Sequence, residues 1–148
     1  MNREIIYRGK RCSDGEWVYG FYVESKYSWQ GHKPHKSWIV PNAISNGGFF
    51  NVLGRYAVKD DTVGQFTGLV DKNGVKIFEG DIVRVCDEDG IDIGVVKYNE
   101  DFGKYVVVYS QVSGNWFDFE GTDGDFLAAF CSEVIGNRYD NPDLLLSK

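Results

Sequence analysis

The sequence predicts a mainly β protein of several short antiparallel strands, with at most one or two short helices. Short apolar runs are separated by glycine and acidic turn signals at intervals of about eight to twelve residues, the spacing typical of all-β sandwiches and barrels. The periodicity of amphipathic helices is scarce. The 148-residue chain also contains 18 glycines against three prolines, which indicates many tight turns.

The first predicted hairpin lies near the N-terminus. Ser13–Glu16, with the sequence Ser-Asp-Gly-Glu, separates a strand over Tyr7–Cys12 from a strand over Trp17–Val23. Alternate side chains of an extended chain share a face, which groups three aromatic residues of the second strand: Trp17, Tyr19 and Phe21.

Residues 25–56 give a weaker pattern. A polar stretch, Ser25–Lys36, runs into the apolar Trp38–Pro41, and Gly47-Gly48 precedes the apolar Phe49–Leu53. Strand-like runs on either side of a glycine turn favour a second hairpin here.

The C-terminal half predicts a series of hairpins. Asp71–Gly74, with the sequence Asp-Lys-Asn-Gly, is a strong turn signal, because Asn-Gly tolerates the positive φ angles of tight turns. Tyr105–Tyr109 is apolar on both faces, so we expect it to be a central or covered strand. The other expected elements are a turn and strand over Ile77–Val85, a turn at Asp87–Gly90, a strand over Ile91–Tyr98, a turn at Asn99–Lys104, a short helix over Phe126–Phe130 and a strand over Glu133–Gly136.

Length and composition predict one domain over 1–148, or two closely packed β halves, with a core that needs no metal or cofactor. The N-terminus lacks the apolar segment of a signal peptide, and no apolar run approaches the ~20 residues of a membrane span. We therefore expect a cytoplasmic protein without a membrane partner. Three widely spaced cysteines fit reduced thiols packed within strands better than a disulfide framework.

The charge is unevenly distributed. Residues 1–40 contain seven Lys and Arg against four Asp and Glu, whereas residues 41–148 contain nine against eighteen, for a net charge of −6 overall. An acidic chain disfavours non-specific nucleic-acid binding, which depends on neutralising phosphates, but the N-terminal part is locally basic.

Several strings in this order resemble the YopX family of phage and prophage proteins. Together they span nearly the whole chain: Arg8-Gly9-Lys10, Gly15–Gly20, Thr62–Gly68, Asp71–Gly74, Ile77–Val83, Glu133–Asn137 and Asn141-Pro142. The resemblance implies a β-rich fold with SH3-like barrel elements, arranged as one YopX-like domain or as sub-barrels at about 1–68 and 69–148. It also implies a phage or prophage origin within a bacterial host cell, without an established activity.

Polar residues in these strings have structural and functional interpretations. Thr62, Gln65 and Thr67 carry hydroxyl and amide groups suited to a binding site, but turn chemistry near Gly64 and Gly68 explains them adequately. We retain Gln65 as a binding candidate.

Catalytic and metal sites are less well supported. Glu79 and Asp81 are spaced to share a face of an extended chain, as acid/base chemistry would require, although carboxylates beside glycine usually cap turns. His32 and His35 lack the Cys-x-x-Cys that would complete a zinc site. We therefore predict no catalytic residues, no metal site and no enzyme activity.

The remaining surface candidate is basic and aromatic. Its residues lie in or near the polar stretch, with Arg8, Lys10 and Arg11 as potential neighbours: Trp29, His32, Lys33, His35, Lys36 and Trp38. Aromatic residues stack on bases while lysines contact phosphates, but tryptophans of β proteins also form protein interfaces. We expect a non-enzymatic module that binds a protein partner or itself; the alternative is single-stranded nucleic-acid binding through Trp29, Lys33, Lys36 and Trp38.

Overall fold

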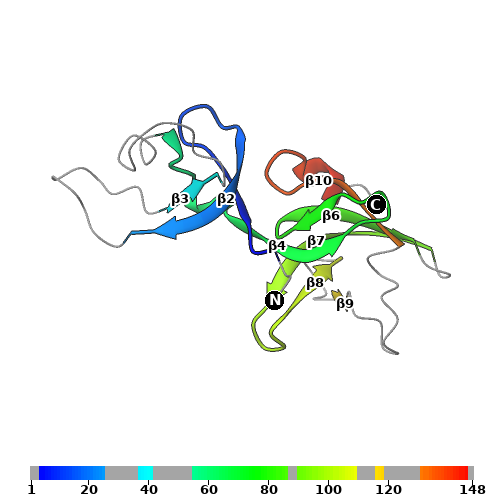
Figure 1. Ribbon diagram of the computed structural model, residues 1–148. Helices are drawn as coiled ribbons and strands as arrows, with labels where there is room; N and C mark the ends of the chain where they lie inside the picture. Colours follow the sequence, from blue (N-terminus) through cyan, green and yellow to red (C-terminus); the bar gives the residue numbers. More distant parts are fainter. Residues whose placement is uncertain are drawn as a thin grey trace. The chain divides into compact units, whose positions relative to one another are not determined.

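The computed structural model describes residues 4–25, 37–41, 55–86, 90–109, 116–118 and 131–146 (Figure 1). Strands dominate these ranges and confirm the mainly β prediction. The strands are β1 (Tyr7–Lys10), β2 (Trp17–Glu24), β3 (Ser37–Val40), β4 (Gly64–Val70), β5 (Lys76–Phe78), β6 (Asp81–Cys86), β7 (Ile91–Asn99), β8 (Lys104–Val108), β9 (Trp116–Asp118) and β10 (Ser132–Asn137).

The strands form two five-stranded sheets, with orders β3-β2-β1-β4-β5 and β10-β6-β7-β8-β9. The chain divides into two compact units, residues 1–66 and 67–148. Strand β4 therefore begins in the first unit, where Gln65 pairs with Tyr7, and ends in the second.

The first hairpin forms where it was predicted. Strands β1 and β2 are antiparallel, with Tyr7 opposite Gly20 and Lys10 opposite Trp17. The side chain of Asp14 closes the turn by accepting a 3.1 Å hydrogen bond from the Glu16 backbone N–H. An aspartate two residues before its donor is a common local device for reversing the chain.

A short segment that contains Ala57 and Val58 pairs with β3 and with the residue that follows β1. Trp38 of β3 pairs with Ala57, and Val58 pairs with Arg11 just beyond β1. The 3-10 helix η1 (Asp60–Thr62) follows and leads into β4.

The core of the first unit lies on the side of the sheet that faces this segment. Its buried members are Val18, Ile39 and Val58, and half-buried tyrosines pack around them. The rings of Tyr7 and Tyr22 lie 5.4 Å apart between centroids. Side chains on this face of β2 are therefore committed to the core.

The turn between β4 and β5 uses the predicted Asp71–Gly74 signal. The Asp71 side chain accepts hydrogen bonds from the backbone N–H groups of Asn73 and Val75, at 2.8 and 2.9 Å. The backbone N–H of Asp71 donates to the Val75 carbonyl at 2.8 Å. One buried carboxylate thus organises the whole turn.

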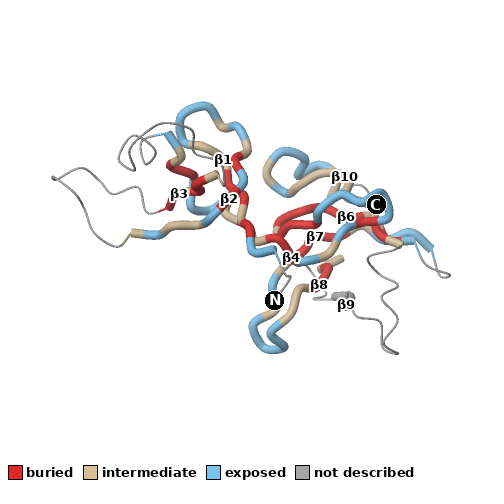
Figure 2. The backbone as a smooth tube through the Cα atoms, in the orientation of Figure 1, coloured by how far each residue is buried: buried red, intermediate tan, exposed pale blue. Residues whose placement is uncertain are grey.

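Strands β6, β7, β8 and β9 pair in sequence, and β10 pairs with the other side of β6, all antiparallel. The middle residues of β6, β7 and β8 are largely buried (Figure 2). Successive residues of β8, Val106 and Val107, point to opposite faces and are both buried. This confirms that the apolar run at Tyr105–Tyr109 is a central, covered strand.

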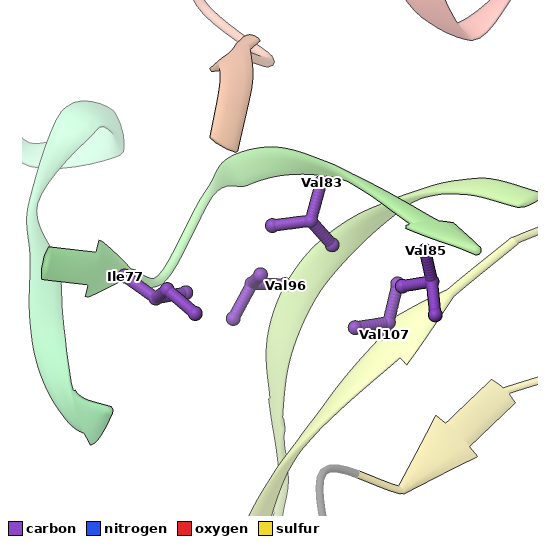
Figure 3. Close-up of a cluster of buried hydrophobic side chains, with 5 residues drawn as sticks. All are labelled: Ile77, Val83, Val85, Val96 and Val107. Carbon is purple, nitrogen blue, oxygen red and sulfur yellow. The ribbon is translucent and has the colours of Figure 1, made fainter. Parts of the chain in front are cut away.

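One core cluster of the second unit collects aliphatic side chains from three paired strands and from β5 (Figure 3). All its members are buried: Ile77, Val83, Val85, Val96 and Val107. Neighbouring strands place them on one face, because Val96 lies opposite Val107 and Val85 lies two positions from Val83.

Three expected features lie outside the described residues: the hairpin strand at Phe49–Leu53, the turn residues 87–89 and the helix over Phe126–Phe130. The C-terminal part ends in a 3-10 helix, η2 (Pro142–Leu145). Within the described ranges, no helix combines the length and hydropathy needed to cross a membrane.

The cysteines depart from expectation in one respect. All three are free thiols, as predicted. However, Cys12 and Cys86 are exposed rather than packed, because Cys12 lies in the first turn and Cys86 lies at the end of β6.

Candidate functional site

Strand β2 has one face in the core and the other toward solvent. Val18 and Tyr22 belong to the core side, whereas the alternate residues Tyr19 and Phe21 are 49% and 55% exposed. Two neighbouring aromatic side chains are therefore held in solvent on a strand that the core fixes from behind.

Strand pairing extends this exposed side into a surface. On β1, Arg8 lies opposite Tyr19 and Lys10 lies opposite Trp17. On β3, Trp38 lies opposite Val23. Directly paired residues share a face of a sheet, so we define the aromatic face as Arg8, Lys10, Trp17, Tyr19, Phe21, Val23, Trp38 and Val40.

Two cations contact the indole of Trp17. The guanidinium carbon of Arg8 lies 4.7 Å from the ring centroid, and the ammonium nitrogen of Lys10 lies 5.6 Å from it. Such contacts contribute about 0.5–2 kcal/mol, more when the cation is desolvated, and Arg8 is buried. Trp17 is thus half-buried and held between β1 side chains.

Gly20 allows the backbones of β2 and β3 to approach closely. A side chain at Gly20 would overlap the carbonyl oxygen of Val40, and its Cβ would lie 2.6 Å from the Val40 carbonyl carbon. Only hydrogen fits where the two backbones approach so closely. Gly20 alternates with the exposed Tyr19 and Phe21, so it lies on the same side of β2 as the core residues Val18 and Tyr22.

Two of the predicted binding residues, Trp38 and Gln65, lie on opposite sides of the sheet. Trp38 lies on the aromatic face, half-buried. Gln65 pairs with Tyr7, whose side chain belongs to the core face, so Gln65 lies on the opposite side of the sheet. Trp29, Lys33 and Lys36 lie outside the described residues.

The two threonines considered with Gln65 have structural partners. The buried Thr62 hydroxyl accepts from the Lys10 backbone N–H at 2.9 Å and donates to the Lys59 carbonyl at 2.7 Å. The buried Thr67 hydroxyl donates to the Ile77 carbonyl at 2.9 Å. These contacts support the structural interpretation of both hydroxyls.

Glu79 and Asp81, the two carboxylates considered for acid/base chemistry, occupy different local structures. Asp81 is 1% exposed and accepts a 2.7 Å hydrogen bond from the Phe78 backbone N–H, which makes it a turn cap. Glu79 lies in the turn itself rather than in an extended segment. His32 and His35 lie outside the described ranges, within which no cluster of three metal-ligating side chains occurs.

Sequence reasoning grouped Tyr19 with Phe21 but did not assign them to a site. Both faces of this strand are apolar, so hydrophobicity does not distinguish the packed face from the open one. The isolated Gly20 signals a close approach of another backbone, as glycine inside a strand often does. It does not indicate which face of β2 remains open.

Comparisons with known proteins agree over nearly the full length of the chain. A family model described as YopX protein matches residues 6–146. The crystal structure of protein EF1440 from Enterococcus faecalis is similar, with a TM-score of 0.52 and 22% sequence identity, over 96% of this chain and 98% of that chain. At this identity the likeness concerns the fold. The curated proteins contain no match.

Proposed function

The chain belongs to the YopX protein family, and we propose that it is a phage or prophage accessory protein that acts in the bacterial cytoplasm as a non-enzymatic, protein-binding module. The binding surface is the aromatic face of the first unit. The observation that carries the proposal is the exposure of Tyr19 and Phe21, side by side on β2.

The composition of the aromatic face supports a protein partner. Tyrosine, tryptophan, phenylalanine and arginine are enriched at protein interfaces, and a few such residues supply most of the binding energy. Here Tyr19 and Phe21 provide accessible apolar area, while Lys10 provides a half-buried cation at its border. This arrangement resembles an apolar centre with a polar rim.

Rigidity also favours binding. The core holds β2 through Val18 and Tyr22, and Arg8 and Lys10 hold Trp17. A surface whose side chains are already ordered loses less conformational entropy when a partner binds.

The test is site-specific photocrosslinking in cells that express the intact chain, followed by reconstitution with the purified partner. A photoreactive residue at Phe21 should capture a defined protein that the same residue at Ile91, which is 67% exposed on β7, does not. Phe21→Ala should then weaken binding of that protein roughly tenfold or more, whereas Ile91→Ala should not. Equal capture at both positions, or unchanged affinity in Phe21→Ala, would contradict the proposal.

A second candidate function is single-stranded nucleic-acid binding. The observation that favours it is the position of Arg8 and Lys10 on the same face as Tyr19, Phe21 and Trp38, since aromatic residues stack on bases and cations contact phosphates. Titration of a labelled single strand at low and moderate salt distinguishes the two functions. Binding that falls steeply with salt and is lost in Lys10→Glu would replace the protein-binding proposal.

A further inference from the structure

Two of the three cysteines lie at the ends of neighbouring strands in the second unit. Ser132, the first residue of β10, pairs with Val85 of β6 in an antiparallel register. Cys86 directly follows Val85 and is the last residue of β6, while Cys131 directly precedes Ser132. The next position of this register therefore places the two cysteines opposite each other.

Opposed positions of this kind are within the range of a disulfide bond. Directly paired residues of antiparallel strands have Cα atoms about 4.5–5.5 Å apart. Disulfide bonds join residues whose Cα atoms are about 4.4–6.8 Å apart. Cys131 is the last helical residue before β10, so pairing with Cys86 extends β10 by this one residue.

Both cysteines are present as free thiols. Cys86 is exposed and Cys131 is half-buried. The remaining cysteine, Cys12, is also exposed but belongs to the first unit. The chain thus contains one pair of thiols at neighbouring strand positions and a third thiol that serves as an internal control.

Charges of both signs surround Cys86. Arg84 lies two positions earlier on the same face of β6, and its paired residue Glu133 forms a 2.9 Å ion pair with Lys72. The pKa of Lys72 is raised mainly by its hydrogen bond to Glu133, and attraction to Cys86 contributes to the same direction. In the sequence, however, three acidic residues, 87–89, follow Cys86. Oxidation of this pair therefore depends on the proximity of the two thiols rather than on strong activation of either one.

We propose that Cys86 and Cys131 form a reversible disulfide bond between β6 and β10 when the protein meets a peroxide. The exposed Cys86 thiolate attacks one oxygen of hydrogen peroxide, the O–O bond breaks, and the second oxygen leaves as hydroxide, which yields a sulfenic acid at Cys86. The Cys131 thiol then attacks the Cys86 sulfur. The S–S bond forms, the S–O bond breaks, and the departing hydroxide takes the thiol proton and leaves as water.

The electrons balance over these two steps. The two thiols lose two electrons in total, and one peroxide is reduced to two molecules of water. A reducing thiol reverses the bond by thiol–disulfide exchange. Disulfides of reducing compartments are usually transient or redox-sensing, and this bond would be of that kind.

The bond would fasten the end of β10 to the centre of the sheet. It closes a loop that contains β7, β8 and β9, and such a cross-link restricts the unfolded chain. The oxidised protein should therefore resist unfolding more than the reduced protein does. The site lies within the second unit and does not use the aromatic face, so the inference goes beyond the proposed function and is independent of it.

The test treats the reduced, purified full chain with hydrogen peroxide and maps its peptides by mass spectrometry without reducing agent. Wild type and Cys12→Ser should both yield a pair of peptides joined through Cys86 and Cys131 within one chain, and dithiothreitol should separate them. Cys86→Ser and Cys131→Ser should each lack this product. Wild-type protein whose two cysteines are oxidised separately, pair with Cys12, or join only between chains would overturn the proposal.

Two further readouts distinguish the pair from isolated reactive thiols. Dimedone, which traps sulfenic acids, should label Cys86 more in Cys131→Ser than in wild type, because the second thiol is missing. Oxidation should raise the urea midpoint of wild type and of Cys12→Ser but not that of Cys131→Ser. Equal dimedone labelling, or a midpoint that oxidation raises equally in Cys131→Ser, would contradict the assigned bond.

Discussion

The side chain of Asp71, in the turn between β4 and β5, accepts a 2.9 Å hydrogen bond from the backbone N–H of Val134 on β10. Beside it, the backbone N–H of Lys72 donates to the Ser132 carbonyl at 3.0 Å. The turn therefore provides hydrogen-bond partners for the Val134 N–H and the Ser132 carbonyl, on the edge of β10 that is not paired with β6. Unpaired groups at a sheet edge invite pairing with other chains, so this contact both stabilises the second unit and protects an edge.

We expect Asp71→Ala to destabilise the protein by about 1–3 kcal/mol, because three backbone donors lose an ionised acceptor. Urea unfolding followed by tryptophan fluorescence measures the loss. Glu133→Gln is the matched control: its side chain forms a 2.9 Å ion pair with Lys72, but both groups are partly exposed. A control as destabilised as Asp71→Ala would show that the turn contact has no special importance.

Acid should remove the contribution of Asp71. Burial raises the pKa of this carboxyl, but hydrogen bonds from Val134, Val75 and Asn73, together with Lys72, outweigh it, so the pKa lies below the ordinary value of 3.8. A carboxyl with a lowered folded-state pKa stabilises the fold above its unfolded-state pKa, and this stabilisation disappears as the pH falls through the folded-state pKa. The difference in unfolding free energy between wild type and Asp71→Asn should therefore be greatest near neutral pH and shrink below about pH 4. A difference that grows on acidification would contradict this assignment.

We expect Gly20→Ala to cost more than about 3 kcal/mol, since the new methyl group overlaps the Val40 carbonyl and neither backbone can move without breaking the β2–β3 pairing. Gly15→Ala is the control. Gly15 has a φ of +76°, but a Cβ added there would meet no heavy atom within 4 Å, so only the backbone cost of about 1–2 kcal/mol applies. Thermal unfolding of both variants checks the order, and equal losses would show that close approach at Gly20 is unimportant.

Ile77 should be among the most sensitive core positions. It is fully buried within the cluster of Figure 3, so Ile77→Ala should cost roughly 2–5 kcal/mol and Ile77→Val roughly 0.5–1.5 kcal/mol. Val75, two residues earlier, is 48% exposed, and Val75→Ala should have little effect. Denaturant unfolding midpoints, compared at an unchanged m-value, would measure the stability of all three variants. An Ile77→Ala variant as stable as wild type would contradict the assignment of Ile77 to the core.

Local turn chemistry made much of the fold predictable. Ser13–Glu16, Asp71–Gly74 and Asn99–Lys104 reverse the chain where predicted, and in each an Asp or Asn side chain accepts nearby backbone N–H groups. These contacts join residues two to four positions apart, so the sequence contains all that they require. The β10–β6 pairing, by contrast, depends on residues distant in the chain.

The candidate site was only partly predictable. Trp38 belongs to the aromatic face, but Gln65 lies on the other side of the sheet, because the β1–β4 register places it opposite Tyr7. Tyr19 and Phe21, which form the accessible centre of the face, were not singled out for binding. The residue types in the sequence indicate an aromatic and basic surface, but they do not indicate which face of β2 is exposed.

The sequence by itself determined the β class, the principal turns and the central position of the β8 strand, because periodicity, turn chemistry and an unbroken apolar run act locally. Only the tertiary structure decided which face of β2 is packed. Both faces are rich in apolar side chains, and the choice depends on the packing of Val58 against Val18 and Ile39. Those contacts arise from strand register, and a shift of one residue would exchange the core and the exposed aromatic face.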